Sequence, residues 1–202
     1  MIGKHYFFAA MALAFATSAL PAHAADNSRQ AIQVAEQAVR QARQDMHAVF
    51  GNTTLRPGQF KWKQGHTGSE VTRIVLDLSR QMAFAYGDGG LVAISTISSG
   101  DKNHLSPVGV YPILAKERMH RSRKYDDAPM PFMQLINNGG VALHGGHLPG
   151  YPASHGCIRL PHSFAQQLFG STDVGDTVVL SAEPEGPPSR NARDRQVALG
   201  AG

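Results

Sequence analysis

The spacing of apolar residues changes along the chain and separates three regions. Residues 6–20 form the only long apolar run of the chain. Between Asn27 and Phe50 the apolar residues recur every three or four positions, which predicts an amphipathic helix with a narrow apolar stripe. Alanine makes up much of that stripe, so we expect the helix to dock weakly on the rest of the domain or on another chain. From residue 71 onward the apolar runs are short and are separated by turn residues, as is typical of strands.

These short runs predict a mainly β domain with one short helix, preceded by the N-terminal amphipathic helix. The expected strands are residues 71–78, 81–86, 91–97, 108–115, 132–136, 141–144 and 177–180. We expect the last of them to close the sheet. The turn residues Gly87-Asp88-Gly89-Gly90 indicate a hairpin. The short helix is expected at residues 161–169, where a proline stands near the start.

Three segments lack such patterns. Residues 51–68 hold turn residues around Trp62 and are expected to form a linker. Residues 116–131 are charged and contain proline, which predicts a long loop of the kind that often serves as a lid. The tail over 183–202 has no apolar period and is expected to be disordered. The predicted organisation is therefore a helix and linker over 25–68 and a domain over 69–182.

The first 24 residues have the parts of a secretory signal peptide. Lys4 and His5 precede the apolar run Tyr6–Leu20, and Ala22-His23-Ala24 fits a cleavage site. The run is shorter than the ~20 apolar residues that a spanning helix needs. We therefore expect export, cleavage after Ala24 and no membrane span afterwards, with an uncleaved anchor as the alternative. The residue directly after this site is Ala25 and not a cysteine, so no lipid anchor is expected.

Composition and charge narrow the function classes. A chain of 202 residues with 42% hydrophobic and 17% charged residues suits one globular domain with extensions. The formal net charge of +4 is too small to indicate nucleic-acid binding, and we expect no nucleic-acid partner. The single cysteine excludes a disulfide scaffold and a zinc ribbon.

The candidate chemistry is centred on that cysteine, Cys157. His155 and Arg159 stand two residues to either side of it and can favour the thiolate. Gly156 lets the backbone approach a substrate closely, and the amides of Gly156 and Cys157 can form an oxyanion hole. His144 ends a predicted strand and is followed by two glycines, a suitable place to present an imidazole. The alternative is that Cys157 is a small buried apolar residue.

A zinc site is the other chemistry that these residues allow. His144, His147, His155 and Cys157 are all possible zinc ligands. However, the two glycines between the first two histidines exclude a helical pair, and no acidic residue lies nearby in the sequence to orient them. We therefore expect no metal and no other cofactor. Taken singly, His147 and His162 are expected to be surface histidines or to have local hydrogen-bond partners.

Five segments together resemble the L,D-transpeptidase catalytic domain, the YkuD family of bacterial cell-wall enzymes. They are Leu76-Asp-Leu-Ser-Arg-Gln81, Ser95-Thr-Ile-Ser-Ser-Gly100, Ser106-Pro-Val-Gly109, His144-Gly and Ser154-His-Gly-Cys-Ile-Arg159. The resemblance covers most of residues 71–180. The gap from His144 to Ser154 is shorter than in mycobacterial members, and Arg159 stands where those members have Asn. Both features are familiar in the proteobacterial and Bacillus-type branch, and we expect a proteobacterial-type member.

The resemblance implies a role for each site residue. Cys157 would be the acyl-enzyme nucleophile and His144 its general base, oriented by the main-chain carbonyl of Gly145. His155, with the amides of Gly156 and Cys157, would line the oxyanion region. The residues alone do not separate His144 from His155 as the base.

Two further residues complete this expected site. Ser154 is expected to shape the loop rather than to react, because the thiol is the stronger nucleophile. Arg159 would hold the loop or a substrate carboxylate, which suits a guanidinium fork. Its alternative role is a buried ion pair that holds the turn.

The implied function is a periplasmic peptidoglycan L,D-transpeptidase with a β-sandwich or barrel domain. Such an enzyme takes the acyl group of a tetrapeptide stem, releases D-Ala, and passes the acyl group to an amine on another stem or on an outer-membrane lipoprotein. The alternative within the same fold is a hydrolase that uses water as acceptor. The alternative from another class is a non-catalytic wall-binding module, which has no need for a lone thiol.

The segment 116–131 would then be the lid over the acyl site. Its basic residues are Arg118, His120, Arg121, Arg123 and Lys124. They are expected to attract acidic wall polymer, and a solvated charge run is the alternative.

Overall fold

The structure is a computed structural model that describes residues 25–63 and 71–183. The expected signal peptide, residues 64–70 of the expected linker and the tail after Glu183 lie outside the described residues. The described elements in chain order are α1 Arg29–Phe50, β1 Phe60–Trp62, β2 Arg73–Asp77, β3 Met82–Gly87, β4 Gly90–Thr96, β5 Gly109–Pro112, β6 Ala115–Arg121, β7 Pro129–Leu135, β8 Ala142–Gly145, β9 Ile158–Leu160, α2 His162–Ser171 and β10 Thr177–Ser181.

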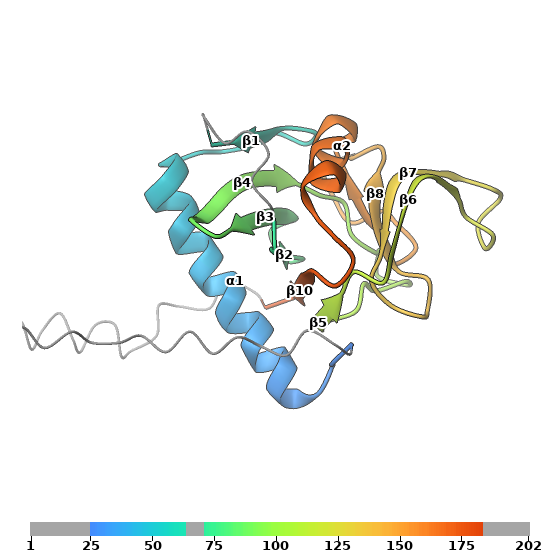
Figure 1. Cartoon of the computed structure of the whole chain (residues 1–202), viewed down its shortest axis with the longest axis horizontal. Coiled ribbons are helices and arrows are strands. Elements are labelled where there is room, and N and C mark those ends of the chain that lie inside the picture. Colours follow the sequence, from blue (N-terminus) through green and yellow to red (C-terminus); the bar gives the residue numbers. More distant parts are fainter. Residues whose placement is uncertain (1–24, 64–70, 184–202) are drawn as a thin grey trace, which may run out of the picture.

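The strands form two sheets, so the prediction of a mainly β domain is confirmed (Figure 1). The larger sheet has the order β1-β4-β3-β2-β10-β5 and the smaller one β6-β7-β8-β9. In the larger sheet, β10 runs parallel to β2, with Val179 opposite Val75. The last strand therefore does not close this sheet at an edge, as the sequence suggested, but lies between β2 and β5. Its residues Val178, Val179 and Leu180 are buried on both faces, as an internal strand requires.

Alternate residues of β2 face two different cores. Ile74 and Leu76 pack into a cluster that also holds Leu143 of the smaller sheet and Phe164 of α2. Val75, which points the opposite way, packs into a second cluster beneath α1. The larger sheet is thus the middle layer, between α1 on one face and the smaller sheet with α2 on the other (Figure 1).

The alanine stripe of α1 docks on this domain. Ala35, Val39 and Ala42 are fully buried against the sheet. The helix begins after Ser28, whose hydroxyl accepts a hydrogen bond from the Ala31 amide, and it ends at Gly51, where φ is 67°. No helix within residues 25–63 and 71–183 is long and apolar enough to cross a membrane.

The expected lid segment is not a loop. Residues 115–121 and 129–135 pair as an antiparallel hairpin, with His120 opposite Met130, and the hairpin extends beyond the body of the protein (Figure 1). The prediction was wrong because β6 is an exposed edge strand. Most of its side chains face solvent, so no alternating apolar pattern marks it. The expected strand 108–115 is likewise divided between β5 and the start of β6.

The expected linker also contains a strand. Phe60 and Trp62 in β1 both pack against the Phe164 ring, with ring centroids 5.5 and 5.7 Å away, while Lys61 between them is exposed. These three residues pair with β4 at the edge of the larger sheet. A run of three is too short for its alternation to stand out among turn residues. The three-residue β9 was not predicted for the same reason.

Candidate active site

Cys157 lines a pocket of about 810 Å³. One wall is the β6–β7 hairpin, another is β8 with the glycines that follow it, and the floor is the loop that carries Cys157. His144, Gly145, Ser154, His155 and Arg159 all line this pocket together with Cys157. The topology therefore brings two segments that are separate in the sequence to one site.

The side chain of Ser154 holds the loop that presents Cys157. Its hydroxyl donates to the carbonyl of Cys157 at 2.5 Å and accepts from the Gly156 amide at 3.1 Å. The hydroxyl is buried and faces the loop backbone, as expected for a residue that shapes the loop. Gly156 has φ of 112°, a conformation that requires glycine here.

The amide of Gly156 is consequently occupied, which differs from the expected oxyanion hole of two free amides. The amide of Cys157, by contrast, has no hydrogen-bond acceptor within the described ranges. This leaves the Cys157 N–H as the donor available to a developing oxyanion.

Ser106 anchors the same loop from outside, and the residue-by-residue reasoning missed it. Its hydroxyl accepts from the Gly100 amide and donates to the carbonyl of Gly156, both at 2.9 Å. Gly100 must lack a side chain, because a Cβ there would lie 2.0 Å from the carbonyl oxygen of His104. The available signal was Ser106-Pro-Val-Gly109, one of the segments that carried the family resemblance.

His144 lies on β8, with 8% of its surface exposed. Its Nδ1 is 2.9 Å from the carbonyl oxygen of Gly145, so Nδ1 carries the proton and Nε2 is left as an acceptor. Burial lowers the pKa of His144, the bond to Gly145 opposes that effect, and the charges of Arg159 and His120 reinforce it. The imidazole is therefore neutral and able to take a proton at neutral pH.

The Cys157 thiol is partly buried and donates a long hydrogen bond to the Gly140 carbonyl, at 3.7 Å. Burial raises the pKa of Cys157, and the Ala142 amide, Arg159 and Lys124 partly offset this. A thiol that is protonated at rest reacts as a nucleophile only if a general base removes its proton.

His155 has a different environment from His144. Its ring stacks on Tyr125 at a centroid distance of 4.5 Å and meets the edge of His104 at 4.7 Å. The residue is exposed, whereas His144 is buried with its tautomer fixed by the Gly145 carbonyl. In the part of the chain that the structure describes, no hydrogen bond joins either ring to Cys157. Burial and the fixed tautomer make His144 the better candidate for the base.

Arg159 lies opposite His144 in the parallel pairing of β8 with β9. Its aliphatic part packs over Gly146, where an added Cβ would meet the Arg159 Cγ at 3.2 Å. Across residues 25–63 and 71–183, no carboxylate lies within ion-pair distance of its guanidinium. The alternative of a buried ion pair at Arg159 therefore finds no partner.

The remaining histidines of the sequence analysis also line the pocket. His147 follows β8, and His162 begins α2, where its ring meets the edge of Phe132 at 5.2 Å. The described residues contain no group of three or more His, Cys, Asp or Glu side chains placed to hold a metal ion. The four residues considered for zinc are thus not gathered around one point.

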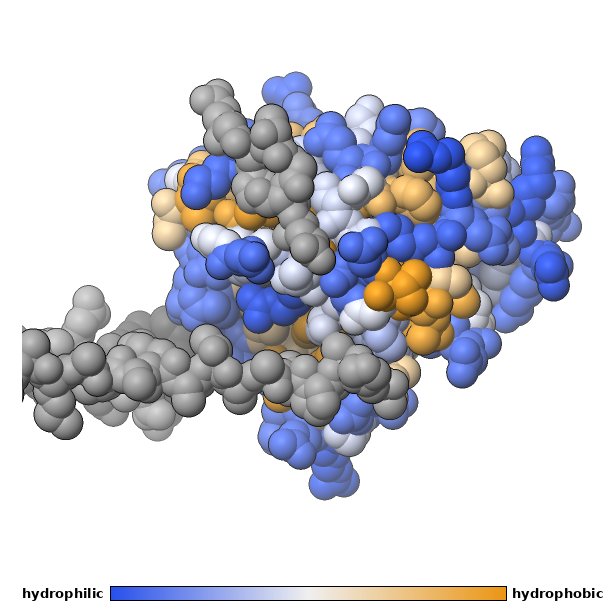
Figure 2. Space-filling model, viewed as in Figure 1, coloured by the Kyte–Doolittle hydropathy of each residue, from blue (hydrophilic) through white to orange (hydrophobic). Residues whose placement is uncertain are grey.

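The pocket has a strongly basic lining. Arg123, Lys124 and Arg159 face it, whereas its one acidic residue, Glu117, is bonded to Nδ1 of His120 at 2.8 Å. The projecting hairpin is hydrophilic on the face shown in Figure 2. Such a lining favours a substrate that carries carboxylates.

The chain was compared with known proteins and solved structures. No curated protein matches the chain. Among solved structures, the chain is similar to an L,D-transpeptidase from Stackebrandtia nassauensis, with 25% identity, a TM-score of 0.52 and coverage of 71% of this chain and 67% of that one.

Two mycobacterial structures show the same fold at 23% identity and a TM-score of 0.51. For the L,D-transpeptidase from Mycobacterium tuberculosis H37Rv, the match covers 54% of this chain and 57% of the mycobacterial chain. For the L,D-transpeptidase from Mycobacterium smegmatis, it covers 57% of this chain and 60% of the mycobacterial chain. The chain thus spans less than two thirds of the length of either mycobacterial protein.

The family model of the L,D-transpeptidase catalytic domain matches residues 71–180, more than half of the 202 residues. The chain therefore belongs to the YkuD family of L,D-transpeptidases.

Proposed function

We propose that the protein is an exported, periplasmic L,D-transpeptidase that uses Cys157 to transfer acyl groups between peptidoglycan stem peptides. The observation that carries this proposal is that Cys157 and His144 line one basic pocket, with His144 Nδ1 fixed on the Gly145 carbonyl. Family membership supports the reaction class.

The first half of the reaction forms a thioester. His144 Nε2 takes the thiol proton as Sγ attacks the carbonyl carbon at the L-centre of diaminopimelate, whose amide links it to the terminal D-Ala. The negative charge that develops on the carbonyl oxygen accepts a hydrogen bond from the free amide of Cys157. The C–N bond then breaks, and D-Ala leaves with the proton that His144 held.

The second half transfers the acyl group. An acceptor amine attacks the thioester carbon, His144 removes the amine proton, and the C–S bond breaks. The proton returns to sulfur, so His144 and Cys157 end as they began. In this proposal Arg159, which lines the pocket and has no carboxylate partner among the described residues, holds a carboxylate of the stem.

The acceptor distinguishes three versions of this function. An amine of another stem gives a 3→3 crosslink, a lysine of an outer-membrane lipoprotein gives wall anchoring, and water gives hydrolysis. We favour an amine acceptor, because the family model that matches the chain is that of L,D-transpeptidases, which pass the acyl group to an amine.

The test uses the reduced protein without residues 1–24, a purified disaccharide-tetrapeptide and mass spectrometry, with Cys157→Ala as the control. A dimer formed with loss of one D-Ala, absent in the control, would establish crosslinking. Cleaved monomer without dimer would assign a hydrolase. An acyl-enzyme at Cys157 that turns over only with a lysine-bearing peptide would assign lipoprotein anchoring. The absence of any adduct on Cys157, with the stem or with a carbapenem, would overturn the proposal.

A further inference from the structure

Gln81 has an unusual conformation at the start of β3. Its φ is +53°, a strained region that residues with a side chain seldom occupy. The backbone carbonyl of Gln81 accepts from the Ile97 amide at 2.9 Å, which fixes this conformation. A glycine would adopt the same backbone conformation without strain. The presence of Gln at this position therefore indicates that its side chain has a role.

The carboxamide of Gln81 makes three hydrogen bonds, two of them to Ser99. Its Nε2 donates to the Leu78 carbonyl at 2.6 Å and to the Ser99 hydroxyl at 2.8 Å, and its Oε1 accepts from the Ser99 amide at 2.9 Å. Ser99 follows β4 and is buried. Gln81 therefore clamps both the backbone and the side chain of Ser99.

Ser99 in turn holds the loop that carries Cys157. Its carbonyl accepts from the amides of Ala153 and Ser154, each at 3.0 Å. The Ser154 hydroxyl then bonds to the Cys157 carbonyl and the Gly156 amide. A continuous chain of hydrogen bonds thus runs from Gln81 through Ser99 and Ser154 to the backbone of the nucleophile.

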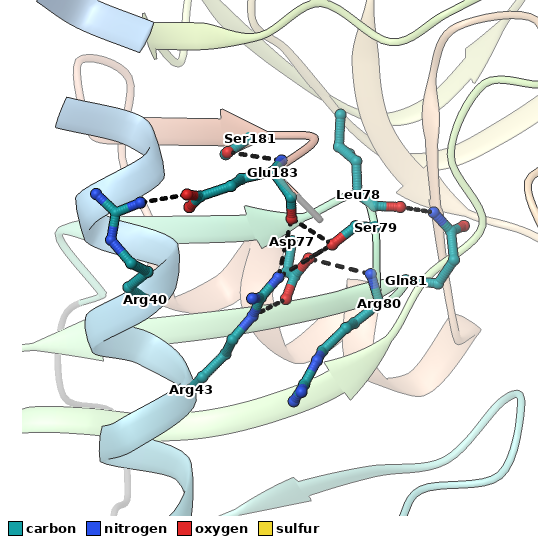
Figure 3. Close-up of polar contacts among 9 residues, drawn as sticks. All are labelled: Arg40, Arg43, Asp77, Leu78, Ser79, Arg80, Gln81, Ser181 and Glu183. Carbon is teal, nitrogen blue, oxygen red and sulfur yellow. Dashed lines mark hydrogen bonds and ion pairs between the residues drawn. The ribbon is translucent and has the colours of Figure 1, made fainter. Parts of the chain in front are cut away.

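The turn that presents Gln81 is itself rigidly supported (Figure 3). The fully buried carboxylate of Asp77 accepts from the Ser79 hydroxyl at 2.7 Å, from the Arg80 amide at 3.0 Å and from Arg43 of α1 at 2.8 Å. Figure 3 shows these bonds on one side of the turn and the Gln81 carboxamide reaching away on the other. The turn therefore offers a fixed base from which Gln81 can hold Ser99.

We infer that Gln81 is a positioning residue for Cys157, acting through Ser99 and Ser154 without touching the thiol. This role explains why a side chain is retained at a strained backbone position. It rests on the proposed acyl transfer at Cys157 for its functional consequence, although the clamp itself exists without that chemistry. Misplacement of a reacting atom by about 1 Å can slow a reaction by about a hundredfold, so a small movement of this loop is sufficient.

The test compares Gln81→Glu with Gln44→Glu, the same change on an exposed position of α1. Glu is isosteric with Gln, but its carboxylate cannot donate to the Leu78 carbonyl or the Ser99 hydroxyl. Amide hydrogen exchange is measured first, because it requires no catalysis. We expect the amides of residues 153–156 to exchange at least about tenfold faster in Gln81→Glu, while those of β10 stay protected. Unchanged exchange at 153–156 would overturn the inference.

The second readout is acylation of Cys157 by a carbapenem. We expect the maximal rate constant in Gln81→Glu to fall about tenfold or more, with half-saturation within twofold of the wild type. The rate of alkylation by iodoacetamide at high pH, where the thiolate is fully formed, should not change. Acylation within twofold of the wild type, or a fall equal to that of Gln44→Glu, would refute the positioning role.

Ser99→Ala keeps the test valid if Gln81→Glu fails to fold. It removes only the hydroxyl that Gln81 holds, and we expect a smaller effect of the same kind on exchange at 153–156 and on acylation. A Ser99→Ala protein with wild-type values in both would contradict the inference. If the wild-type protein itself is not acylated, the proposed function is refuted instead. Hydrogen exchange of the amides of residues 153–156 would then still test the role of Gln81.

Discussion

Arg43 on helix α1 donates a hydrogen bond from Nε to the Oδ2 atom of Asp77, at 2.8 Å, and Asp77 is completely buried at the end of β2. The match to the family model begins at residue 71, so α1 lies outside the part of the chain that defines the family. The ion pair, with the alanine stripe beside it, nevertheless makes the helix part of the same folded body.

The first prediction concerns this ion pair. Arg43→Met retains most of the side-chain volume but leaves the buried Asp77 carboxylate without the guanidinium of residue 43. Breaking a buried pair in this way typically costs about 3 kcal/mol, and for a domain of this size each kcal/mol lowers Tm by about 2–4 °C. Thermal unfolding of the reduced protein measures the change.

Arg40→Met is the matched control. Arg40 pairs with Glu183, but half of its side chain is exposed, and exposed pairs contribute about 1 kcal/mol or less. Adding Asp77→Asn to Arg43→Met should restore part of the lost stability, because an amide can be buried without a counter-ion. Equal losses in Arg43→Met and Arg40→Met would show that α1 is held by its apolar face alone.

The second prediction concerns pH. Burial lowers the pKa of His144, so the base stays neutral as pH falls through the ordinary imidazole value of about 6.5. Burial raises the pKa of Cys157, so the thiol stays protonated through the neutral range. We expect the acylation rate constant to be flat across neutral pH and to fall only on the acid side, as His144 becomes protonated.

Ultraviolet thiolate absorbance gives an independent measurement. Wild type and Cys157→Ser should show no difference in thiolate absorbance at neutral pH, because general-base catalysis starts from a thiol. A clear thiolate signal that disappears in Cys157→Ser would instead indicate a preformed ion pair with His144, and the reaction would then need no base in its first step.

The third prediction concerns Ser106. Ser106→Ala removes the hydroxyl that joins the Gly100 amide to the Gly156 carbonyl and leaves both groups buried without that partner. Each such loss costs about 1–3 kcal/mol, and we expect acylation of Cys157 to slow about tenfold as the loop loosens. Ser106→Thr keeps the hydroxyl and should retain most of the rate. If the Thr variant is as slow as the Ala variant, the hydroxyl is not what matters at this position.

The residues that share the pocket were easier to predict from the sequence than the elements around them. Cys157, His144 and Arg159 were singled out because a thiol, an imidazole and a guanidinium are chemically distinct and lie in two short segments, and the structure places all three in the pocket. Their roles as nucleophile, base and cation stay predictions. The sequence could not indicate which of His144 and His155 is the better candidate for the base. Two histidines differ only in their burial and their hydrogen-bond partners, and both depend on residues distant in the sequence. Tyr125, whose ring stacks on His155, comes from a hairpin that was expected to be a loop.

Some strands of the fold could be predicted from the sequence and others could not. For strands buried on at least one face, such as β2 and β4, the expected ends lie within one or two residues of the observed ends. The edge strands β1 and β6 were not, since an edge strand needs few apolar residues. The parallel pairings of β10 with β2 and of β8 with β9 could not be predicted, because they join segments that are not adjacent in the sequence and no local sequence pattern indicates them.

The fourth prediction separates substrate recognition by the hairpin from a merely solvated charge run. Arg121 is held by Asp127 across the turn, whereas Arg123 lines the pocket. Arg123→Glu should therefore raise the half-saturating concentration of tetrapeptide about fivefold at low salt and leave the maximal acylation rate unchanged. The increase should become smaller at higher salt, because salt screens the charge.

The control is Arg56→Glu, which makes the same charge change at an exposed position that does not line this pocket. An equal effect in both variants would mean that net charge attracts the substrate from a distance, and no effect in either would mean that the charges of the hairpin serve solvation alone.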